Sequence, residues 1–189
     1  MQPNTNAITN LLEANPVIAA VKDGEAAEAA AASGVGAVFL LGGDILTLPQ
    51  RVAMLRDAGK KVFLHIDLIE GVGRDAAGVR YISRVMRADG VISTRGNLMK
   101  TAAEEGLWGV LRLFMLDSAS LSSGMKLLEA AQPAMVELMP GLVGKAIQHF
   151  SKCGFPVIAG GMITTRQEAA AALAAGALAV STSRRELWV

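Results

Sequence analysis

The chain has 189 residues, of which 52% are hydrophobic and 4% aromatic, and its formal net charge is +1. This length fits one domain with a substantial core, and the near-neutral charge excludes a protein that binds nucleic acid through its overall charge. A single cysteine precludes an intrachain disulfide, and there is no signal segment and no apolar run that could span a bilayer, so we expect a cytoplasmic protein with no membrane partner.

The chain divides into a short arm and one domain. Residues 1–14 contain several asparagines and a proline, with few apolar residues to dock. We therefore expect a flexible N-terminal arm over residues 1–14 and a single domain over residues 15–189.

Short apolar runs alternate with helix-like segments through the domain. Continuous apolar runs are typical of parallel strands covered by helices, and helices of this kind often end at a glycine. The runs predict an α/β fold, a compact (β/α)8 TIM-like barrel, with its binding site at the carboxyl ends of the strands. The predicted strands are 17–21, 37–41, 62–67, 90–93, 109–115, 134–138, 156–159 and 178–181, and the clearest helices are 23–32, 48–58, 100–105 and 165–175.

The third predicted strand ends with two polar residues, His65 and Asp67. Alternation along a strand places them on the same face, where they can hold a hydroxyl group of a ligand. For His65 the alternative is a hydrogen-bonded core residue, whereas a lone buried carboxylate such as that of Asp67 is costly. We expect no metal ion, because no second His or Cys lies at ligand spacing.

Arginines follow this strand and recur at other strand ends. Arg80, Arg84 and Arg87 have the i, i+4, i+7 spacing that puts side chains on one helical face. Such a stripe either contacts the phosphates of an RNA or is an ordinary solvated face. The complete set of candidate RNA-binding residues is Arg74, Arg80, Arg84, Arg87, Arg95, Arg184 and Arg185.

Arg112 lies between two leucines of the fifth predicted strand and needs a partner for its charge. Glu137, on the sixth strand, is the natural candidate. The pair is either a structural ion pair in the mouth of the barrel or part of a binding site for a polyol.

Two polar turns follow the last two strands. Gly160 and Gly161 form the first turn, and Ser181, Thr182 and Ser183 form the second. In (β/α)8 barrels, turns at these two places commonly form a phosphate cup, because glycine lets the backbone approach an oxyanion and helix N-termini offer unpaired N–H groups. The turns predict a small phosphorylated ligand, although paired glycines also serve as tight connections.

Seven segments in this order resemble the bacterial glycerol-3-phosphate responsive antiterminator family. They are NPVIAAV (15–21), HIDLIEG (65–71), ISTR (92–95), RLFMLDS (112–118), ELMPG (137–141), AGGMI (159–163) and STS (181–183), followed by Leu187 and Trp188. The resemblance implies a TIM-barrel regulator that is not an enzyme and needs no cofactor. Its effector would be glycerol 3-phosphate and its partner the leader mRNA of glycerol-utilisation genes.

Barrel geometry distributes this ligand over the predicted residues. The phosphate would lie on the two polar turns, and the hydroxyls would meet His65, Asp67, Arg112 and Glu137. The alternative is a phosphosugar isomerase, epimerase or lyase with Asp67 and Glu137 as its acid–base pair, because a fold does not determine function. The Ala-rich helix near 169–175 suits either a homodimer or the barrel wall.

Overall fold

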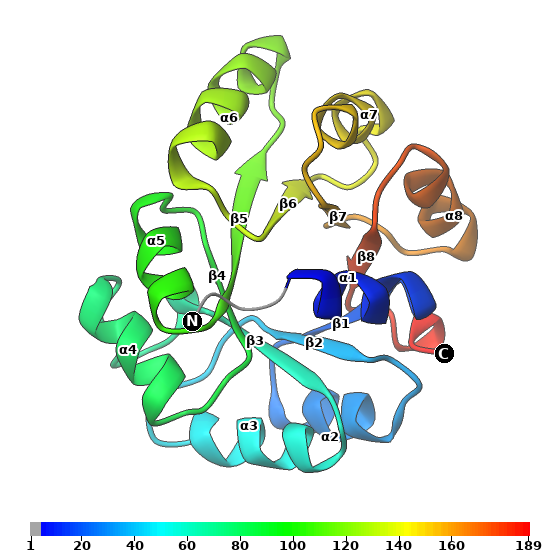
Figure 1. Ribbon diagram of the computed structural model, residues 1–189. Helices are drawn as coiled ribbons and strands as arrows, with labels where there is room; N and C mark the ends of the chain where they lie inside the picture. Colours follow the sequence, from blue (N-terminus) through cyan, green and yellow to red (C-terminus); the bar gives the residue numbers. More distant parts are fainter. Residues whose placement is uncertain (1–4) are drawn as a thin grey trace.

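The computed structural model describes residues 5–189 and contains a closed barrel of eight parallel strands (Figure 1). Each strand pairs with the next, and β8 closes the barrel by pairing with β1. The predicted single-domain TIM barrel is confirmed. Its strands are β1 (Val17–Val21), β2 (Ala37–Leu40), β3 (Lys61–His65), β4 (Gly90–Ser93), β5 (Trp108–Phe114), β6 (Met135–Met139), β7 (Val157–Gly160) and β8 (Ala179–Thr182).

Helices surround the barrel and connect successive strands (Figure 1). None of the described helices is both long and apolar enough to cross a membrane. The α-helices are α1 (Thr5–Ala14), α2 (Gly24–Ala32), α3 (Leu48–Asp57), α4 (Ala76–Arg84), α5 (Asn97–Glu104), α6 (Ser118–Ala131), α7 (Gly144–Lys152) and α8 (Arg166–Ala174), and the short 3-10 helices are η1 (Ile66–Leu68) and η2 (Arg185–Leu187).

Two apolar cores hold the barrel together. The larger core lies between the strands and the surrounding helices, where residues such as Leu55 and Phe150 are fully buried. The smaller core fills the barrel interior around Phe39 and Phe63, whose rings pack edge to face with centroids 5.4 Å apart. Alternate residues of each strand supply the two cores, as the period of two requires.

The N-terminal segment differs from the flexible arm that was predicted. Residues 1–4 lie outside the described part of the chain, but Thr5–Ala14 forms α1, which crosses one end of the barrel (Figure 1). Ile8 and Leu12 on α1 are at most 1% exposed and join the core inside the barrel. The arm is therefore a plug, because the open end of the barrel exposes apolar surface that α1 covers.

Two predicted elements end earlier than the sequence pattern indicated. β3 stops at His65, so Asp67 lies in η1 rather than in the strand. α4 stops at Arg84, so Arg87 lies beyond the helix, with a left-handed backbone at φ 56°. The prediction that His65 and Asp67 share a strand face is wrong for this reason. The prediction that Arg87 shares a helical face with Arg80 and Arg84 is wrong for the same reason.

Candidate functional site

A cavity of about 270 Å³ opens at the carboxyl ends of the strands. Most of the polar groups predicted from the ends of β5 to β8 surround it. It is lined by Ala20, Lys22, Leu41, Arg112, Glu137, Met139, Gly161, Met162, Ile163, Thr164, Ser181, Thr182, Ser183 and Arg184. We call this cavity the mouth.

A buried polar network forms the inner wall of the mouth. Arg112 and Glu137 occupy paired positions on β5 and β6, and the Arg112 Nε donates to Glu137 Oε2 at 2.7 Å. The Ser181 Oγ on β8 donates to the other carboxylate oxygen at 2.7 Å. Glu137 is 1% exposed and Arg112 is 8% exposed, so the ion pair predicted from the sequence exists and is buried.

Gly160 is the reason that this network can reach from β6 to β8. A Cβ atom at Gly160 would lie 2.4 Å from Glu137 Oε1 and 2.8 Å from Ser181 Oγ. Any side chain on β7 at this point would separate the carboxylate from the hydroxyl. Gly160 therefore holds the network open, and it is Gly161, its neighbour, that lines the mouth.

The mouth carries an excess of positive charge. Lys22, Arg112 and Arg184 line it, and Glu137 is the one carboxylate that does so among the described residues. Lys22 directly follows β1, a position that could have marked it as a site residue from the sequence. Arg184, predicted to contact RNA, instead lies at the mouth. The net charge of +2 favours an anionic ligand.

The two polar turns meet beside the mouth. The Thr182 Oγ1 donates to the Ile163 carbonyl at 2.7 Å and accepts from the Arg184 N–H at 3.1 Å, so this hydroxyl links the turns. The N–H groups of Met162 and Ser183 donate to no other described residue. These backbone donors fit the predicted cup.

The N-terminus of α8 is capped by side chains of its own segment. Thr165 and Glu168 form a capping box, and Glu168 also accepts from the N–H and the hydroxyl of Thr164 at 2.7 and 2.9 Å. The bonds from Thr164 hold the pKa of Glu168 below its usual range. The N–H groups of Thr164, Thr165 and Glu168 are therefore already occupied by side chains of the same segment.

His65 and Asp67 form a second polar cluster near the network. The Asp67 Oδ2 accepts from Ser93 Oγ at 2.9 Å and from the Thr94 N–H at 2.8 Å, which ties η1 to the end of β4. Two buried side-chain atoms in the described chain, His65 Nδ1 and Asp67 Oδ1, have no hydrogen-bond partner. Unsatisfied buried polar atoms are uncommon, and they mark positions where a ligand or a water can bind.

Burial keeps His65 neutral. The imidazole is 2% exposed, and loss of hydration, together with repulsion from Arg112, lowers its pKa to about 4. The effect of Arg112 also shows that His65 and the Arg112–Glu137 pair share one electrostatic environment. The neutral imidazole can donate to or accept from a hydroxyl group.

The predicted arginine stripe is divided by ion pairs. Arg84 donates two hydrogen bonds of 2.8 Å to Glu105, and the Arg80 Nε lies 3.8 Å from the same carboxylate. The pKa of Arg84 is raised by these bonds. The Arg87 side chain forms no ion pair with any described residue.

The other predicted arginines are scattered. The Arg95 Nε lies 3.6 Å from Asp67 Oδ1, and Arg185 donates to Glu25 at 2.7 Å. Arg74 lines a separate depression in the loop after β3. The structure therefore does not bring the seven candidate RNA-binding residues onto one surface.

Comparison with known proteins identifies relatives of this chain. A family described as "Glycerol-3-phosphate responsive antiterminator" matches residues 17–188. The "Uncharacterized protein YgcP" of Escherichia coli (strain K12) is 35% identical over 182 residues, which cover 96% of this chain and 95% of that protein.

Solved structures give the same relationship. The glycerol uptake operon antiterminator regulatory protein of Listeria monocytogenes is 32% identical, with a TM-score of 0.88 and coverage of 92% of this chain and 95% of that one. A glycerol uptake operon antiterminator-related protein of Thermotoga maritima is 34% identical, with a TM-score of 0.82 and coverage of 91% and 96%. The N-acetylmannosamine-6-phosphate 2-epimerase of Clostridium perfringens shares the fold, with a TM-score of 0.72 at 14% identity and coverage of 95% and 91%.

Proposed function

The chain belongs to the glycerol-3-phosphate responsive antiterminator family, and from this premise we propose that it is a cytoplasmic, non-catalytic regulator that binds glycerol 3-phosphate in the mouth and acts on the leader mRNA of glycerol-utilisation genes. The observation that carries the ligand assignment is the charge of the mouth. Lys22, Arg112 and Arg184 against Glu137 leave a charge of +2, which balances a phosphate monoester dianion.

The size and polarity of the site agree with a small polyol phosphate. The cavity of about 270 Å³ is slightly smaller than the roughly 300–1,000 Å³ that is typical of ligand pockets, so it suits a small ligand. The phosphate would take the donors of the two polar turns with Lys22 and Arg184. His65 and Asp67 do not line the mouth itself. Their two atoms without a hydrogen bond would take hydroxyl groups of a ligand that reaches past the Arg112–Glu137 pair.

Isothermal titration with glycerol 3-phosphate tests the ligand, with glycerol and inorganic phosphate as controls. We expect saturable binding of glycerol 3-phosphate that exceeds binding of either fragment. Gly161→Ala should weaken it, because the new Cβ atom would meet Met139 Cε at 2.7 Å and displace that side chain in the mouth.

A matched variant separates this effect from backbone strain. Gly59 has a similar left-handed backbone, at φ 80° against 73° for Gly161, but a Cβ atom there meets nothing within 4 Å. Gly59→Ala should therefore keep the affinity for glycerol 3-phosphate. Equal affinity in wild type and Gly161→Ala would reject this placement of the ligand.

The same preparation tests the absence of catalysis. A phosphosugar enzyme would convert a small phosphorylated sugar and lose that activity in Asp67→Asn, whereas the regulator would bind glycerol 3-phosphate without converting it. Turnover that disappears in Asp67→Asn would overturn the regulator.

A further inference from the structure

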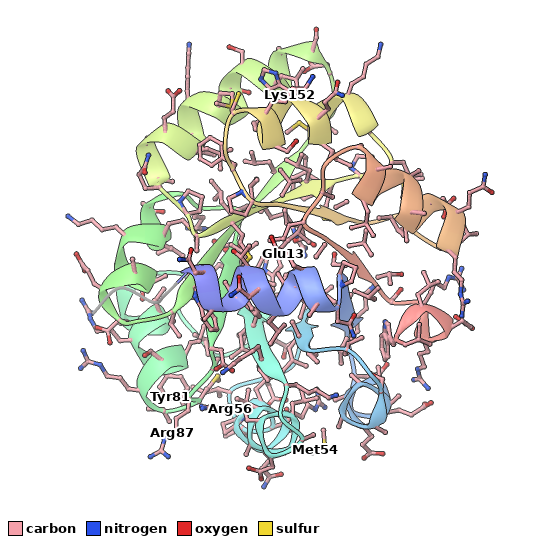
Figure 2. All side chains as sticks on the ribbon, turned by 45° about the vertical axis from the view of Figure 1, so that its right-hand side comes forward. Glu13, Met54, Arg56, Tyr81, Arg87 and Lys152 are labelled. Carbon is pink, nitrogen blue, oxygen red and sulfur yellow. The ribbon has the colours of Figure 1, made fainter. Side chains whose placement is uncertain are left out.

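A groove of about 420 Å³ lies between α3 and the segment that follows α4. It belongs to neither the mouth nor its loops. Its walls are Pro49, Ala53, Arg56, Asp57, Val85, Met86 and Arg87. Because the helices run antiparallel to the strands, the last turns of α3 and α4 lie toward the end of the barrel opposite the mouth, the end that α1 closes (Figure 2).

Two arginines and Asp57 are the charged residues of this groove, which therefore has a net charge of +1. An Arg56 Nη group donates to the Arg87 carbonyl, and the Arg56 Nε lies 4.0 Å from Asp89 Oδ2, so the Arg56 side chain is held in place. Arg87 is exposed and makes no ion pair within the described chain. Within the part of the chain that the structure describes, Arg56 is therefore an oriented cation and Arg87 is a cation without an ion pair.

The backbone at Arg87 is costly for an arginine. Its φ of 56° is in the left-handed region, which glycine adopts without strain and arginine does not. A residue in such a conformation is often kept for the position of its side chain. Here the conformation places a long cationic side chain at the edge of the groove.

Apolar surface lies beside these cations. Val85 is 55% exposed, and the half-buried Tyr81 is one helical turn earlier, with its carbonyl accepting from the Val85 N–H at 2.9 Å. Figure 2 shows Arg56, Tyr81 and Arg87 in the same region of the molecule. Cations next to apolar and aromatic side chains suit a ligand with both phosphates and bases.

Positive and negative charges are unevenly distributed along the chain, although its net charge is near zero. Residues 48–105, which run from α3 past α5, carry ten Lys and Arg against seven Asp and Glu, whereas residues 1–47 carry one against five. α3, α4 and α5 are neighbours around the barrel. The sector that contains the groove therefore has a net charge of +3, and the preceding sector has −4, so an anionic partner is steered toward the groove.

We propose that this groove binds single-stranded RNA, with Arg56 and Arg87 on phosphates and with Val85 and Tyr81 against bases. This assignment rests on the proposed function, which requires an RNA partner. A single strand is favoured because its bases are free to meet apolar side chains, whereas those of a duplex are stacked inside it. RNA and glycerol 3-phosphate then occupy opposite ends of the barrel and share no residue.

Fluorescence anisotropy with a fluorescein-labelled, mixed-sequence single-stranded RNA oligonucleotide tests the groove. Arg87→Glu should weaken binding by roughly tenfold and lower the dependence of log K on log salt by about 0.7 per lost phosphate contact. Lys152→Glu is the matched control, because Lys152 is an exposed cation at the C-terminal end of α7 and lies on the other side of the molecule from Arg87 (Figure 2). It should leave the RNA affinity unchanged.

Two further variants separate binding from folding. Arg87→Gly removes the charge and suits the left-handed backbone, so it should weaken RNA binding while its melting temperature stays the same or rises. Asp57→Asn removes a negative charge from the groove wall and should tighten RNA binding.

The outcomes are distinct for the groove and for the proposed function. If the wild type binds RNA and Arg87→Glu and Lys152→Glu behave alike, the groove is rejected and the regulator stands. If the wild type binds glycerol 3-phosphate in the titration but binds neither this oligonucleotide nor a hairpin RNA, both the groove and the action on mRNA are rejected. Binding of an acidic protein at the groove in place of RNA would also overturn the inference.

Discussion

At the scale of single residues, Gly160 shows how a missing side chain supports a buried network. Gly160→Ala would place a methyl group against the Glu137 carboxylate and the Ser181 hydroxyl, and would break a buried ion pair or strain β7. We expect a loss of about 3 kcal/mol in the free energy of unfolding, the scale for disrupting a buried ion pair. Urea denaturation measures it.

Gly154→Ala provides the comparison, because a Cβ atom there meets nothing within 4 Å. Its backbone is left-handed, at φ 87°, so a cost of about 1 kcal/mol is expected from strain alone. A Gly160→Ala variant no less stable than Gly154→Ala would contradict the role given to Gly160.

The lowered pKa of His65 predicts how the free energy of unfolding depends on pH. Its pKa is about 4 in the folded protein and 6.5 in the reference state, so the folded state binds fewer protons between these values. The stabilisation is complete above pH 6.5 and is lost as the pH falls toward 4, by up to about 3 kcal/mol. Urea denaturation across this range should show a smaller slope for His65→Gln than for wild type. Identical slopes would show that His65 does not carry the effect.

At the scale of elements, α1 acts as the plug of the barrel. Leu12→Ala should lower the free energy of unfolding by about 2–5 kcal/mol, the range for a large-to-small change in a core, because Leu12 is 1% exposed among the side chains inside the barrel. Glu13→Ala, at the exposed neighbouring position shown in Figure 2, should change it by less than about 0.5 kcal/mol. Similar values for the two variants would mean that α1 does not stabilise the barrel.

The signal for α1 was present in the sequence. Ile8, Leu11 and Leu12 have the i, i+3, i+4 spacing of an amphipathic helix. The surrounding asparagines and the proline, which disfavour a helix, instead led to the prediction of a flexible arm. The strands were easier to predict, because each is a continuous apolar run between polar turns. A single amphipathic segment is harder to predict, because its stability depends on the surface that it covers.

At the scale of the whole molecule, we propose separate roles for the two ends of the barrel. Binding of glycerol 3-phosphate should therefore stabilise mainly the end that contains the mouth. Glycerol 3-phosphate at 100 times its Kd should raise the free energy of unfolding by about 2.7 kcal/mol. Hydrogen exchange should slow in residues 161–164 and 181–184, which line the mouth, and change less in the turn at 85–88, which contributes to the groove. Slower hydrogen exchange confined to residues 85–88 would contradict the placement of the ligand in the mouth.

The sequence by itself determined the barrel, the family and six of the fourteen residues that line the mouth, which are Arg112, Glu137, Gly161, Ser181, Thr182 and Ser183. Eight apolar runs with polar ends are sufficient for the barrel and its polar rim, because a parallel strand buried on both faces leaves room for polar groups mainly at its ends. The family followed from the resemblance of seven ordered segments. The Arg112–Glu137 pair followed from the cost of an unpaired charge in an apolar strand.

Only the tertiary structure decided which of these residues meet and which do not. Strand length decided that Asp67 turns toward β4, helix length decided that Arg87 leaves the face of Arg80 and Arg84, and closure of the barrel brought Lys22 and Arg184 to the mouth. Periodicity describes one element at a time. The end of an element and the residues beside it depend on contacts between segments far apart in the chain, and these contacts leave no local pattern.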